Sequence, residues 1–440
     1  MHALFRIATL ILLSSAAHTA TFTVTQIADS SDICDSNCSL REAITAANSA
    51  AGADTIAFAI PGTGPFVLGV ASTLPAINET LSIDGYTQAG SQVNTAQLGS
   101  DAVLQIELRG GGTAGIGLAL CAPNILVRGL AITGFGSAGL HTATSGPFSC
   151  VAPSSNVRIE GNFIGVQADG VTARGNGHGM VINNAMTHVG GVELAQRNII
   201  ASNNNNGLLF EGSNLAGSSA LGNLIGTDRS GVLDRGNNGA GVRVDAAQDI
   251  LIGNAFAPNF FAFSQVGVNV GTGSQRIDVA NNFIRLHDAL GIDLSAFGPN
   301  GVTPNDVDDI DFGSNSLQNF PELQSLARTA TGLRIQGFLD VPAATQNTPY
   351  RLTFYASTSC DSSGFGEGER LLGAVTHNFS QGSAESFEIL LDTSNLPIGS
   401  FLTSTATGPA GTSEFSSCFR LDGVIFSSGF ENALANLQGG

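Results

Sequence analysis

The chain has 440 residues and a formal net charge of -18, and all 17 of its basic residues are Arg. The absence of Lys excludes Schiff-base lysines and the Lys of phosphate-binding loops. The acidic balance opposes binding to nucleic acid or anionic lipid, so we expect no nucleic-acid partner. The 56 Gly and 33 Asn, with only 12% charged residues, are typical of many short strands joined by tight turns.

Residues 1–20 have the pattern of a secretory signal peptide. Arg6 supplies the positive charge, residues 7–13 form the apolar region, and small residues precede Ala20. The apolar region is too short to span a bilayer, and no later segment approaches eighteen uninterrupted apolar residues. We therefore expect a secreted or cell-surface protein with no transmembrane segment in the mature chain.

Six Cys in an exported chain favour disulfides over free thiols. Six cysteines allow fifteen connectivities, and proximity in the sequence favours one of them. The pairs that we expect are Cys34–Cys38, Cys121–Cys150 and Cys360–Cys418.

The first helix signal lies beside the first pair of cysteines. Ser39 and Glu42 have the spacing of a capping box, in which each side chain binds the backbone N–H of the other residue. Leu40 and Ile44 then lie on one helical face. We expect this short helix to cover the open end of the next domain.

Internal repeats dominate the region that follows. The string GNFIG at 161–165 returns as GNLIG at 222–226, which is 61 residues later, and a weaker copy starts at Asn281. A unit of this length fits three turns of about twenty residues each in a parallel β-helix. Asn tolerates corner geometry and can stack into amide ladders, which suits the runs at 183–184, 203–206 and 281–282. The sequence predicts an all-β, parallel β-helix.

The composition changes after residue 297. Four carboxylates stand close together without a nearby Arg, at Asp306, Asp308, Asp309 and Asp311. Ca²⁺ accepts irregular loops of oxygen ligands, so these residues are a candidate calcium site, although the spacing is not that of an EF-hand. A solvated acidic linker is the alternative. About six alternating strands follow, which indicates a small antiparallel β-sandwich. The last residues are too apolar for a simple linker.

These observations divide the chain into six parts. They are a signal peptide (1–20), an N-terminal strand and cap (21–53), the β-helix (54–297), an acidic junction (298–324), a β-sandwich (325–422) and a C-terminal tail (423–440).

The string CSLREAI at 38–44 resembles the opening of the CSLREA-type exported bacterial proteins. The strings SIDGYTQ at 82–88, VRGLAI at 127–132, GNLIGTD at 222–228 and LQNFP at 317–321 also resemble that family. The resemblance implies a right-handed parallel β-helix, or pectin-lyase-like, fold and an Ig-like domain in the last hundred residues. The family has no agreed activity, so the resemblance implies fold and export rather than chemistry.

An enzymatic function would need catalytic residues of specific kinds. A polysaccharide lyase needs a base and metal-binding carboxylates, for which Arg174 and Arg235 with Asp169 and Asp228 are candidates, although duplicated turn residues would look the same. A glycoside hydrolase needs two facing carboxylates, which the sequence alone does not locate. His178 and His188 match no zinc signature and stay unassigned.

The sequence therefore favours an exported β-helix protein that acts by binding, with an extracellular polysaccharide or another cell-surface or matrix ligand as partner. A polysaccharide lyase or glycoside hydrolase on the same fold is the first alternative, and a structural spacer is the second. Apart from possible Ca²⁺, no cofactor is expected.

Overall fold

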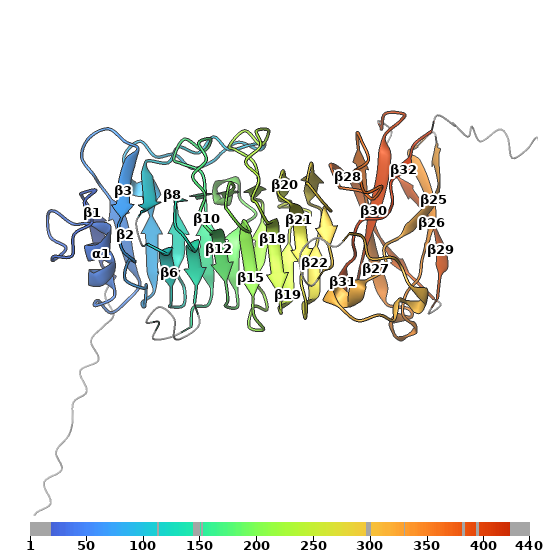
Figure 1. Cartoon of the computed structure of the whole chain (residues 1–440), viewed down its shortest axis with the longest axis horizontal. Coiled ribbons are helices and arrows are strands. Elements are labelled where there is room, and N and C mark those ends of the chain that lie inside the picture. The colour runs from blue at the N-terminus through green and yellow to red at the C-terminus, as the bar shows by residue number, and fades with distance from the viewer. Residues whose placement is uncertain are drawn as a thin grey trace, which may run out of the picture.

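The computed structural model describes residues 19–111, 114–143, 150, 153–295, 301–329, 331–380, 383–392 and 396–422. The expected tail and all but the last two residues of the expected signal peptide lie outside these ranges. The described chain forms an elongated body, with the N-terminal residues at one end and the C-terminal strands at the other (Figure 1).

Three parallel sheets, here called A, B and C, run along the first part of the body. Sheet A contains β1 (Thr21–Val24), β2 (Asp54–Phe58), β4 (Leu81–Asp84), β7 (Leu126–Arg128), β10 (Val157–Glu160), β13 (Thr187–Gly190), β16 (Ser219–Leu221), β19 (Gln248–Ile252) and β22 (Gln275–Val279). Sheet B contains β3 (Phe66–Val70), β5 (Ile106–Gly110), β8 (Leu130–Thr133), β11 (Phe163–Ile164), β14 (Ile199–Ile200), β17 (Leu224–Ile225), β20 (Phe260–Ala262) and β23 (Phe283–Arg285). Sheet C contains β6 (Ile116–Leu120), β9 (Ala138–Thr142), β12 (His178–Ile182), β15 (Leu208–Glu211), β18 (Ala240–Asp245), β21 (Val266–Val270) and β24 (Ile292–Asp293).

From β4 onward the chain visits the three sheets in turn, so each coil adds one strand to each sheet. Successive coils pair in parallel, as Phe163 does with Ile199 and Ile199 with Leu224. This is the parallel β-helix expected from the repeats, and its right-handed sense, expected from the resemblance, is that of almost all crossovers between parallel strands. The predicted all-β fold class is therefore confirmed. Short 3-10 helices interrupt the coils at η1 (Gly85–Thr87) and η2 (Leu194–Gln196).

Buried asparagines form a ladder at the corner between sheets A and B, here called the first Asn ladder. In each step the side-chain Oδ1 of one Asn accepts the backbone N–H and the side-chain N–H of the Asn one coil before it. Every member is at most 1% exposed. The members are Asn162, Asn198, Asn223, Asn259 and Asn282.

A second Asn ladder occupies the corner between sheets B and C. It runs through Asn176, Asn203 and Asn237, and it continues to the hydroxyl of Ser264. At the turns, backbone N–H and C=O groups have no partner in the sheets. Both ladders supply hydrogen bonds to these groups, which is required because the corners are buried. The Asn runs at 203–206 and 281–282 were expected at corners, and each places one residue in a ladder.

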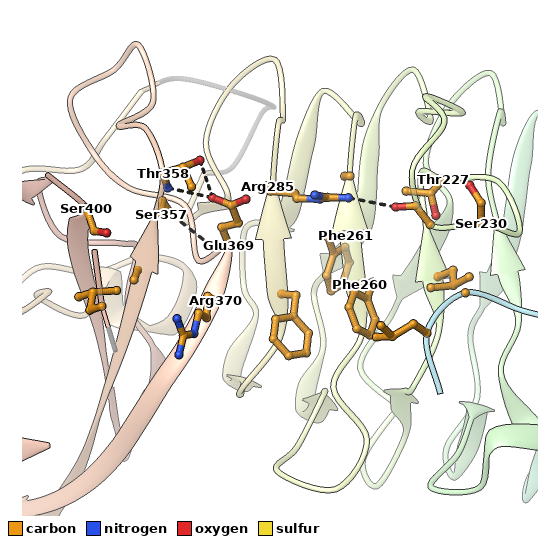
Figure 2. Close-up of a pocket in the computed structure, with 18 of the residues that line it drawn as sticks. Thr227, Ser230, Phe260, Phe261, Arg285, Ser357, Thr358, Glu369, Arg370 and Ser400 are labelled. Atoms are coloured by element: carbon orange, nitrogen blue, oxygen red, sulfur yellow. Dashed lines mark hydrogen bonds between the residues drawn. The ribbon is translucent and has the colours of Figure 1, made fainter. Parts of the chain in front are cut away.

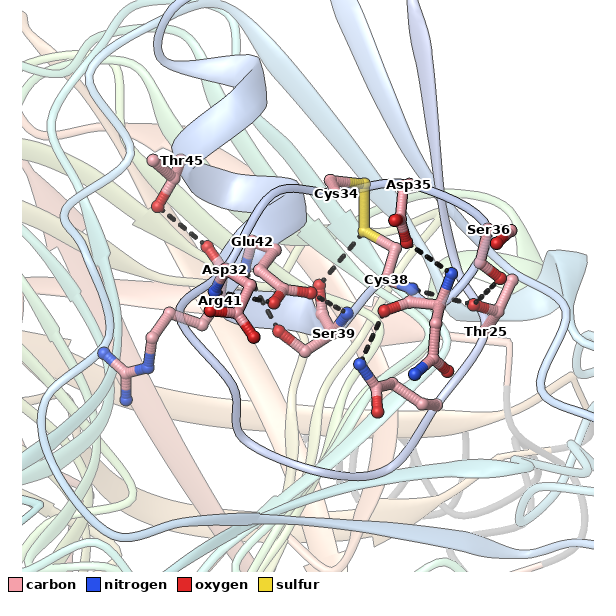
Figure 3. Close-up of a disulfide and its surroundings, with 12 residues drawn as sticks. Thr25, Asp32, Cys34, Asp35, Ser36, Cys38, Ser39, Arg41, Glu42 and Thr45 are labelled. Atoms are coloured by element: carbon pink, nitrogen blue, oxygen red, sulfur yellow. Dashed lines mark hydrogen bonds between the residues drawn. A yellow bond between two sulfur atoms is a disulfide. The ribbon is translucent and has the colours of Figure 1, made fainter.

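The N-terminal end of the β-helix is covered by α1 (Leu40–Ala47) (Figure 1). Figure 3 shows the disulfide next to this helix. The Ser39 hydroxyl accepts the N–H of Glu42, and the Glu42 carboxylate accepts the N–H of Ser39. Leu40 and Ile44 are buried in the same cluster as the first coils. The Cys34–Cys38 disulfide closes the loop before the helix.

The C-terminal unit consists of two antiparallel sheets around a core of their own. One sheet contains β25 (Glu322–Arg328), β26 (Leu333–Leu339) and β29 (Glu385–Leu391). The other contains β27 (Pro349–Ser357), β28 (Arg370–Asn378), β30 (Phe401–Gly408), β31 (Gly411–Thr412) and β32 (Phe419–Arg420). The short helix η5 (Ala343–Thr345) lies between β26 and β27. The Cys360–Cys418 disulfide joins two loops of this unit, and Cys121–Cys150 joins two segments of the β-helix.

The C-terminal unit is joined directly to the last coil of the β-helix. β31 pairs with β22, so sheet A continues into the unit. Arg351 forms an ion pair with Asp278 of β22. The side chains of Tyr355 and Phe415 pack into the β-helix core. The open end of the solenoid is therefore covered by the unit itself.

Two glutamates of the C-terminal unit, the partly buried Glu367 and the buried Glu414, accept backbone N–H groups of the last coil. Glu367 accepts those of Leu286 and His287, and Glu414 accepts that of Leu294 at 2.9 Å. Burial raises the pKa of Glu367 to about 7 and the pKa of Glu414 to about 7. The described part of the expected acidic junction contains η3 (Val307–Asp309) and η4 (Ser314–Leu317). η4 also joins this contact, because the Asn315 side chain accepts the N–H of Ile277 in β22 at 3.0 Å.

The ladders predict a large cost for removing one amide. Asn223→Ala leaves buried partners on both neighbouring coils unsatisfied, at about 1–3 kcal/mol for each group. We expect the free energy of unfolding, measured by urea denaturation, to fall by about 3 kcal/mol or more. Asn204→Ala, at an exposed position of the Asn run, is the control and should change it by less than about 0.5 kcal/mol. Equal effects of the two substitutions would contradict the role of the ladder.

Candidate ligand-binding groove and acidic cluster

An apolar row faces outward on sheet B, directly after each member of the first Asn ladder. It is here called the outer row, and its register follows from the strand pairing. Its members are Ala131, Phe163, Ile199, Leu224, Phe260 and Phe283. The residue after each member points inward to the main core, as Ile164 and Ile225 do.

A covering segment, residues 88–105, lies over the first coils of the outer row and runs along the outside of the body (Figure 1). Ala102 and Leu104 bury Phe163, Ile199 and Leu224 in one cluster. Two arginines hold this segment from below. Arg197 donates to the carbonyls of Ala96, Gln97 and Gly99, and Arg229 donates to those of Ser100 and Ala102.

The cover ends before the last two members of the outer row. Phe260 and Phe283 are only partly buried, and their rings stack with centroids 4.6 Å apart and planes 22° apart. They form the floor of a groove of about 460 Å³. Leu98, at the end of the cover, is 77% exposed and forms one side of this groove.

The opposite wall of the groove belongs to the C-terminal unit (Figure 2). It includes residues 356–358 at the end of β27, Glu369 and Arg370 around the start of β28, and Leu396, Pro397 and Ser400. The groove therefore exists only because the β-helix and the C-terminal unit are joined. Its volume lies within the range usual for small-ligand sites.

Polar groups surround the aromatic floor. Glu369 accepts the N–H and the hydroxyl of Thr358 at 2.9 and 3.0 Å through a single carboxylate oxygen, Oε2. Arg285 donates one N–H to the carbonyl of Gly231 at 3.0 Å, and a guanidinium has five N–H donors in all. Arg370 is exposed. The groove thus offers donors and acceptors beside two partly exposed aromatic rings.

The groove lacks the paired acids of a glycosidase. Among its described lining residues, Glu369 is the only carboxylate. Hydrolysis of a glycoside normally uses two carboxyl groups on opposite sides of the bond. The arrangement can therefore bind a hydroxyl-rich molecule, whereas a second acid for hydrolysis would have to come from elsewhere.

The residues considered for a lyase are engaged in turns. Asp169 accepts the N–H groups of Val171 and Thr172, and Asp228 accepts the hydroxyl of Ser230 and the N–H of Leu233. These are local turn contacts of the kind that a duplicated loop would repeat.

Arg174 and Arg235, the two arginines considered for a lyase, also contact backbone carbonyls of neighbouring turns. Arg235 donates to the carbonyl of Val171 at 2.7 Å, and Arg174 lies 3.5 Å from the carbonyl of Gly110.

The two unassigned histidines lie on different sheets. His178 belongs to β12 of sheet C, and burial lowers its pKa. His188 belongs to β13 of sheet A and lies 2.9 Å from the Ser219 hydroxyl. The structure does not bring the two histidines together.

Three of the four expected metal ligands do come together. One carboxylate oxygen from each of Asp306, Asp309 and Asp311 lies within 4.8 Å of the others, and they are here called the acidic cluster. Asp308 is not part of it. The backbone at Asp308 is left-handed (φ 63°), and adjacent side chains leave the backbone in different directions. Of the four candidate ligands, three therefore lie together, and metal binding by them stays a prediction.

The acidic cluster carries more negative charge than its own contacts balance. Asp309 accepts the N–H of Asn319 and the side-chain N–H of Gln318, both at 2.9 Å. Burial, with smaller contributions from neighbouring carboxylates, raises the pKa of Asp309 to about 7 and that of Asp311 to about 6. The Oδ1 atoms of Asp306 and Asp311 are buried without a hydrogen-bond partner among the described residues. Such oxygens suit a hard cation such as Ca²⁺.

The groove was not among the sites expected from the sequence. A usable signal was nevertheless present. Phe163, Phe260 and Phe283 each follow a ladder Asn, and an inward apolar residue comes next. Two consecutive apolar residues in a short strand must face opposite sides of the sheet. One of each pair therefore points outward and needs a cover.

Comparison with known proteins found no matching family model and no matching curated protein. Among solved structures, the chain is similar to the Dettilon tailspike protein (gp208), with 10% identity, a TM-score of 0.23, and coverage of 80% of this chain and 90% of that one. It is also similar to tailspike protein 2 (TSP2, ORF211) from the Escherichia coli O157:H7 bacteriophage CAB120, with 11% identity, a TM-score of 0.21, and coverage of 86% of this chain and 65% of that one. Likeness at these TM-scores carries no argument about ligand or activity. No helix among the described residues is long and apolar enough to cross a membrane.

Proposed function

We propose that this protein acts outside the cell by binding a glycan chain in the groove between the β-helix and the C-terminal unit. The observation that carries the proposal is the open stack of Phe260 and Phe283 beside the polar groups of Arg285, Glu369 and Arg370. Sugars present C–H groups on one face and hydroxyls around the rim. Aromatic faces suit the former, because they carry partial negative charge, and charged donors and acceptors suit the latter.

Location and shape favour a polymer over a small metabolite. The groove lies on the lateral face of a long solenoid, a surface that repeat proteins commonly use for extended ligands. The three disulfides are consistent with an oxidising compartment outside the cytosol. Export and a cell-surface or secreted location are part of this proposal, as is the assignment of the C-terminal unit to the Ig-like class.

Binding is favoured over cleavage because the groove has one carboxylate where a hydrolase needs two. The lyase candidates are engaged in turns, which removes the residues that supported that alternative. A structural spacer that binds no ligand would not account for the partly exposed stack of Phe260 and Phe283.

We also propose that Ca²⁺ occupies the acidic cluster and stabilises the contact between the two parts of the body. Asp306, Asp309 and Asp311 would supply part of the usual six to eight oxygen ligands, and Asp340 has a buried unpartnered Oδ1 among the described residues. The role is structural, since the residues that line the groove do not include this cluster.

The groove predicts a specific loss of glycan binding. The full chain should be retained on at least one member of a panel of acidic and neutral polysaccharides. Phe283→Ala should then weaken binding at least about tenfold, a usual effect for a central aromatic contact. Retention and Kd would be measured by affinity electrophoresis and calorimetry, and unsaturated products would be followed by ultraviolet absorbance.

The matched control for that experiment is Phe256→Ala, because Phe256 is 87% exposed and does not line the groove. It should leave the Kd unchanged. No retention on any glycan, or equal losses for the two variants, would contradict glycan binding in the groove. Unsaturated products would establish the lyase alternative instead.

Calcium should raise the melting temperature of the full chain, since a ligand that binds only the folded state adds about 2.7 kcal/mol at a hundredfold excess over Kd. Asp309→Asn should abolish this gain. It should not lower the melting temperature without calcium, because it removes a buried and repelled charge. Asp308→Asn, outside the cluster, is the control and should keep the gain. Scanning calorimetry with calcium and with EDTA measures both effects, and an unchanged melting temperature in calcium would contradict the site.

A further inference from the structure

The two arginines of the groove differ from many arginines elsewhere on the protein. The chain has 35 acidic residues and only 17 basic ones, so a carboxylate partner for an arginine is easily found. Seven arginines among the described residues form ion pairs, as Arg351 does with Asp278. Arg285 and Arg370 line the groove, and neither forms an ion pair with a described residue. Their charges therefore remain open to a ligand.

Arg285 is held in place at the β-helix end of the groove. It lies on β23 two residues after Phe283, so both side chains leave the same face of sheet B. Its register neighbour on β20 is the small Ala262. One guanidinium N–H donates to the carbonyl of Gly231 at 3.0 Å (Figure 2). The other N–H groups of Arg285 have no acceptor among the described residues.

A second polar group lies at the same end of the groove. Thr227 lines the groove and is only 2% exposed, and its hydroxyl has no hydrogen-bond partner among the described residues. Thr227 and Gly231 belong to one turn, which the bridge between Thr227 and Asp234 closes. Figure 2 shows the guanidinium of Arg285 directed toward this turn. A buried hydroxyl without a partner is unfavourable, and a ligand oxygen that accepts its proton would remove that cost.

The carboxylate in this turn is engaged within the turn itself. Asp228 is 2% exposed, and its Oδ1 accepts the hydroxyl of Ser230 at 2.6 Å and the N–H of Leu233 at 3.1 Å. It forms no ion pair with Arg285. The guanidinium of Arg285 is therefore an unneutralised donor beside an unpartnered hydroxyl.

We propose that Arg285 and Thr227 form a subsite for an anionic substituent, a carboxylate or a sulfate ester, on the sugar that stacks on Phe283. The groove then selects an acidic glycan over a neutral one. A planar guanidinium can donate to two oxygens of such a group at once, and charge-assisted hydrogen bonds are about twice as strong as neutral ones. This inference rests on the proposed glycan binding and adds to it the class of sugar.

Arg370 contributes less to this selection than Arg285 does. Arg370 is exposed and has no hydrogen bond with a described residue, so its long side chain loses more rotamer freedom when it binds a ligand. Ion pairs between exposed groups contribute little to binding or stability. Arg285 is partly buried and already fixed by Gly231, so the preference for an anion depends mainly on Arg285.

The net charge of -18 does not oppose an acidic ligand at this position. At physiological ionic strength the interaction between exposed charges is screened within about 8 Å, so the local charges decide. The described lining residues of the groove contain two arginines and one carboxylate, Glu369. The groove is thus locally positive on an acidic protein.

The test compares polysaccharides that differ only in their charged groups. Alginate, hyaluronan and chondroitin sulfate are the acidic probes, each paired with its carboxyl-reduced form, and chondroitin sulfate also with its desulfated form. Calorimetry with the full chain should show at least one acidic probe bound about tenfold or more tightly than its matched form without the recognised group. The two modified forms of chondroitin sulfate distinguish a carboxylate from a sulfate.

Three variants locate the preference. Arg285→Gln should weaken binding of the acidic probe about tenfold or more and leave the Kd of the matched neutral form within about twofold. Thr227→Val removes only an unpartnered hydroxyl, so it should keep the melting temperature and weaken binding of the acidic probe about threefold. Arg158→Gln is the control, because it removes the same charge from an exposed position of β10 outside the groove. It should change neither Kd.

The outcomes separate this inference from the proposed function. If acidic and neutral forms bind with equal Kd and Phe283→Ala weakens both, glycan binding in the groove stands and selection of an acidic sugar is overturned. If the preference persists in Arg285→Gln and in Thr227→Val, the subsite is overturned. If no charged or neutral form binds at all, the proposed glycan function fails, and this inference fails with it.

Discussion

The buried Asn ladders are the constraint on which the rest of the structure depends. This β-helix turns sharply after strands of only two to six residues, so backbone N–H groups at its corners lose their partners. The amide of Asn replaces them, because one side chain both accepts an N–H and donates to a carbonyl. In the first Asn ladder each residue therefore sets the position of the next coil. This register then decides which neighbouring side chains face inward and which face outward.

The groove follows from that register. The residue after each ladder Asn points out of sheet B, and the outer row it creates is apolar along its whole length. Covering such a row is necessary, because exposed apolar patches promote association. Residues 88–105 cover the first coils, and Arg197 and Arg229 hold them in place. Phe260 and Phe283 lie beyond this cover, and the C-terminal unit turns them from an open patch into a walled groove.

Much of the fold could be predicted from the sequence because its causes are local. The GNFIG and GNLIG strings at a 61-residue spacing mark equivalent coils, and Ser39 with Glu42 defines the start of α1 through contacts three residues apart. Each of the three disulfides joins two cysteines that follow one another in the order of cysteines along the chain. The groove could not be predicted in this way. It depends on how far the cover of residues 88–105 extends along the outer row. It also depends on Glu369 and Arg370, which belong to the C-terminal unit more than eighty residues after Phe283. The acidic cluster was predicted in part, because four Asp residues stand close together at 306–311. That Asp308 lies outside the cluster depends on the direction of its side chain, which the sequence does not show.

The central claim is that the ligand lies on the uncovered end of the outer row. Hydrogen–deuterium exchange of the full chain, with and without a saturating glycan identified on the panel, tests this most directly. The account predicts that protection is confined to peptides containing residues 260–285, 356–370 and 396–400. Protection on sheet C or over residues 88–105, with no change around Phe283, would contradict it.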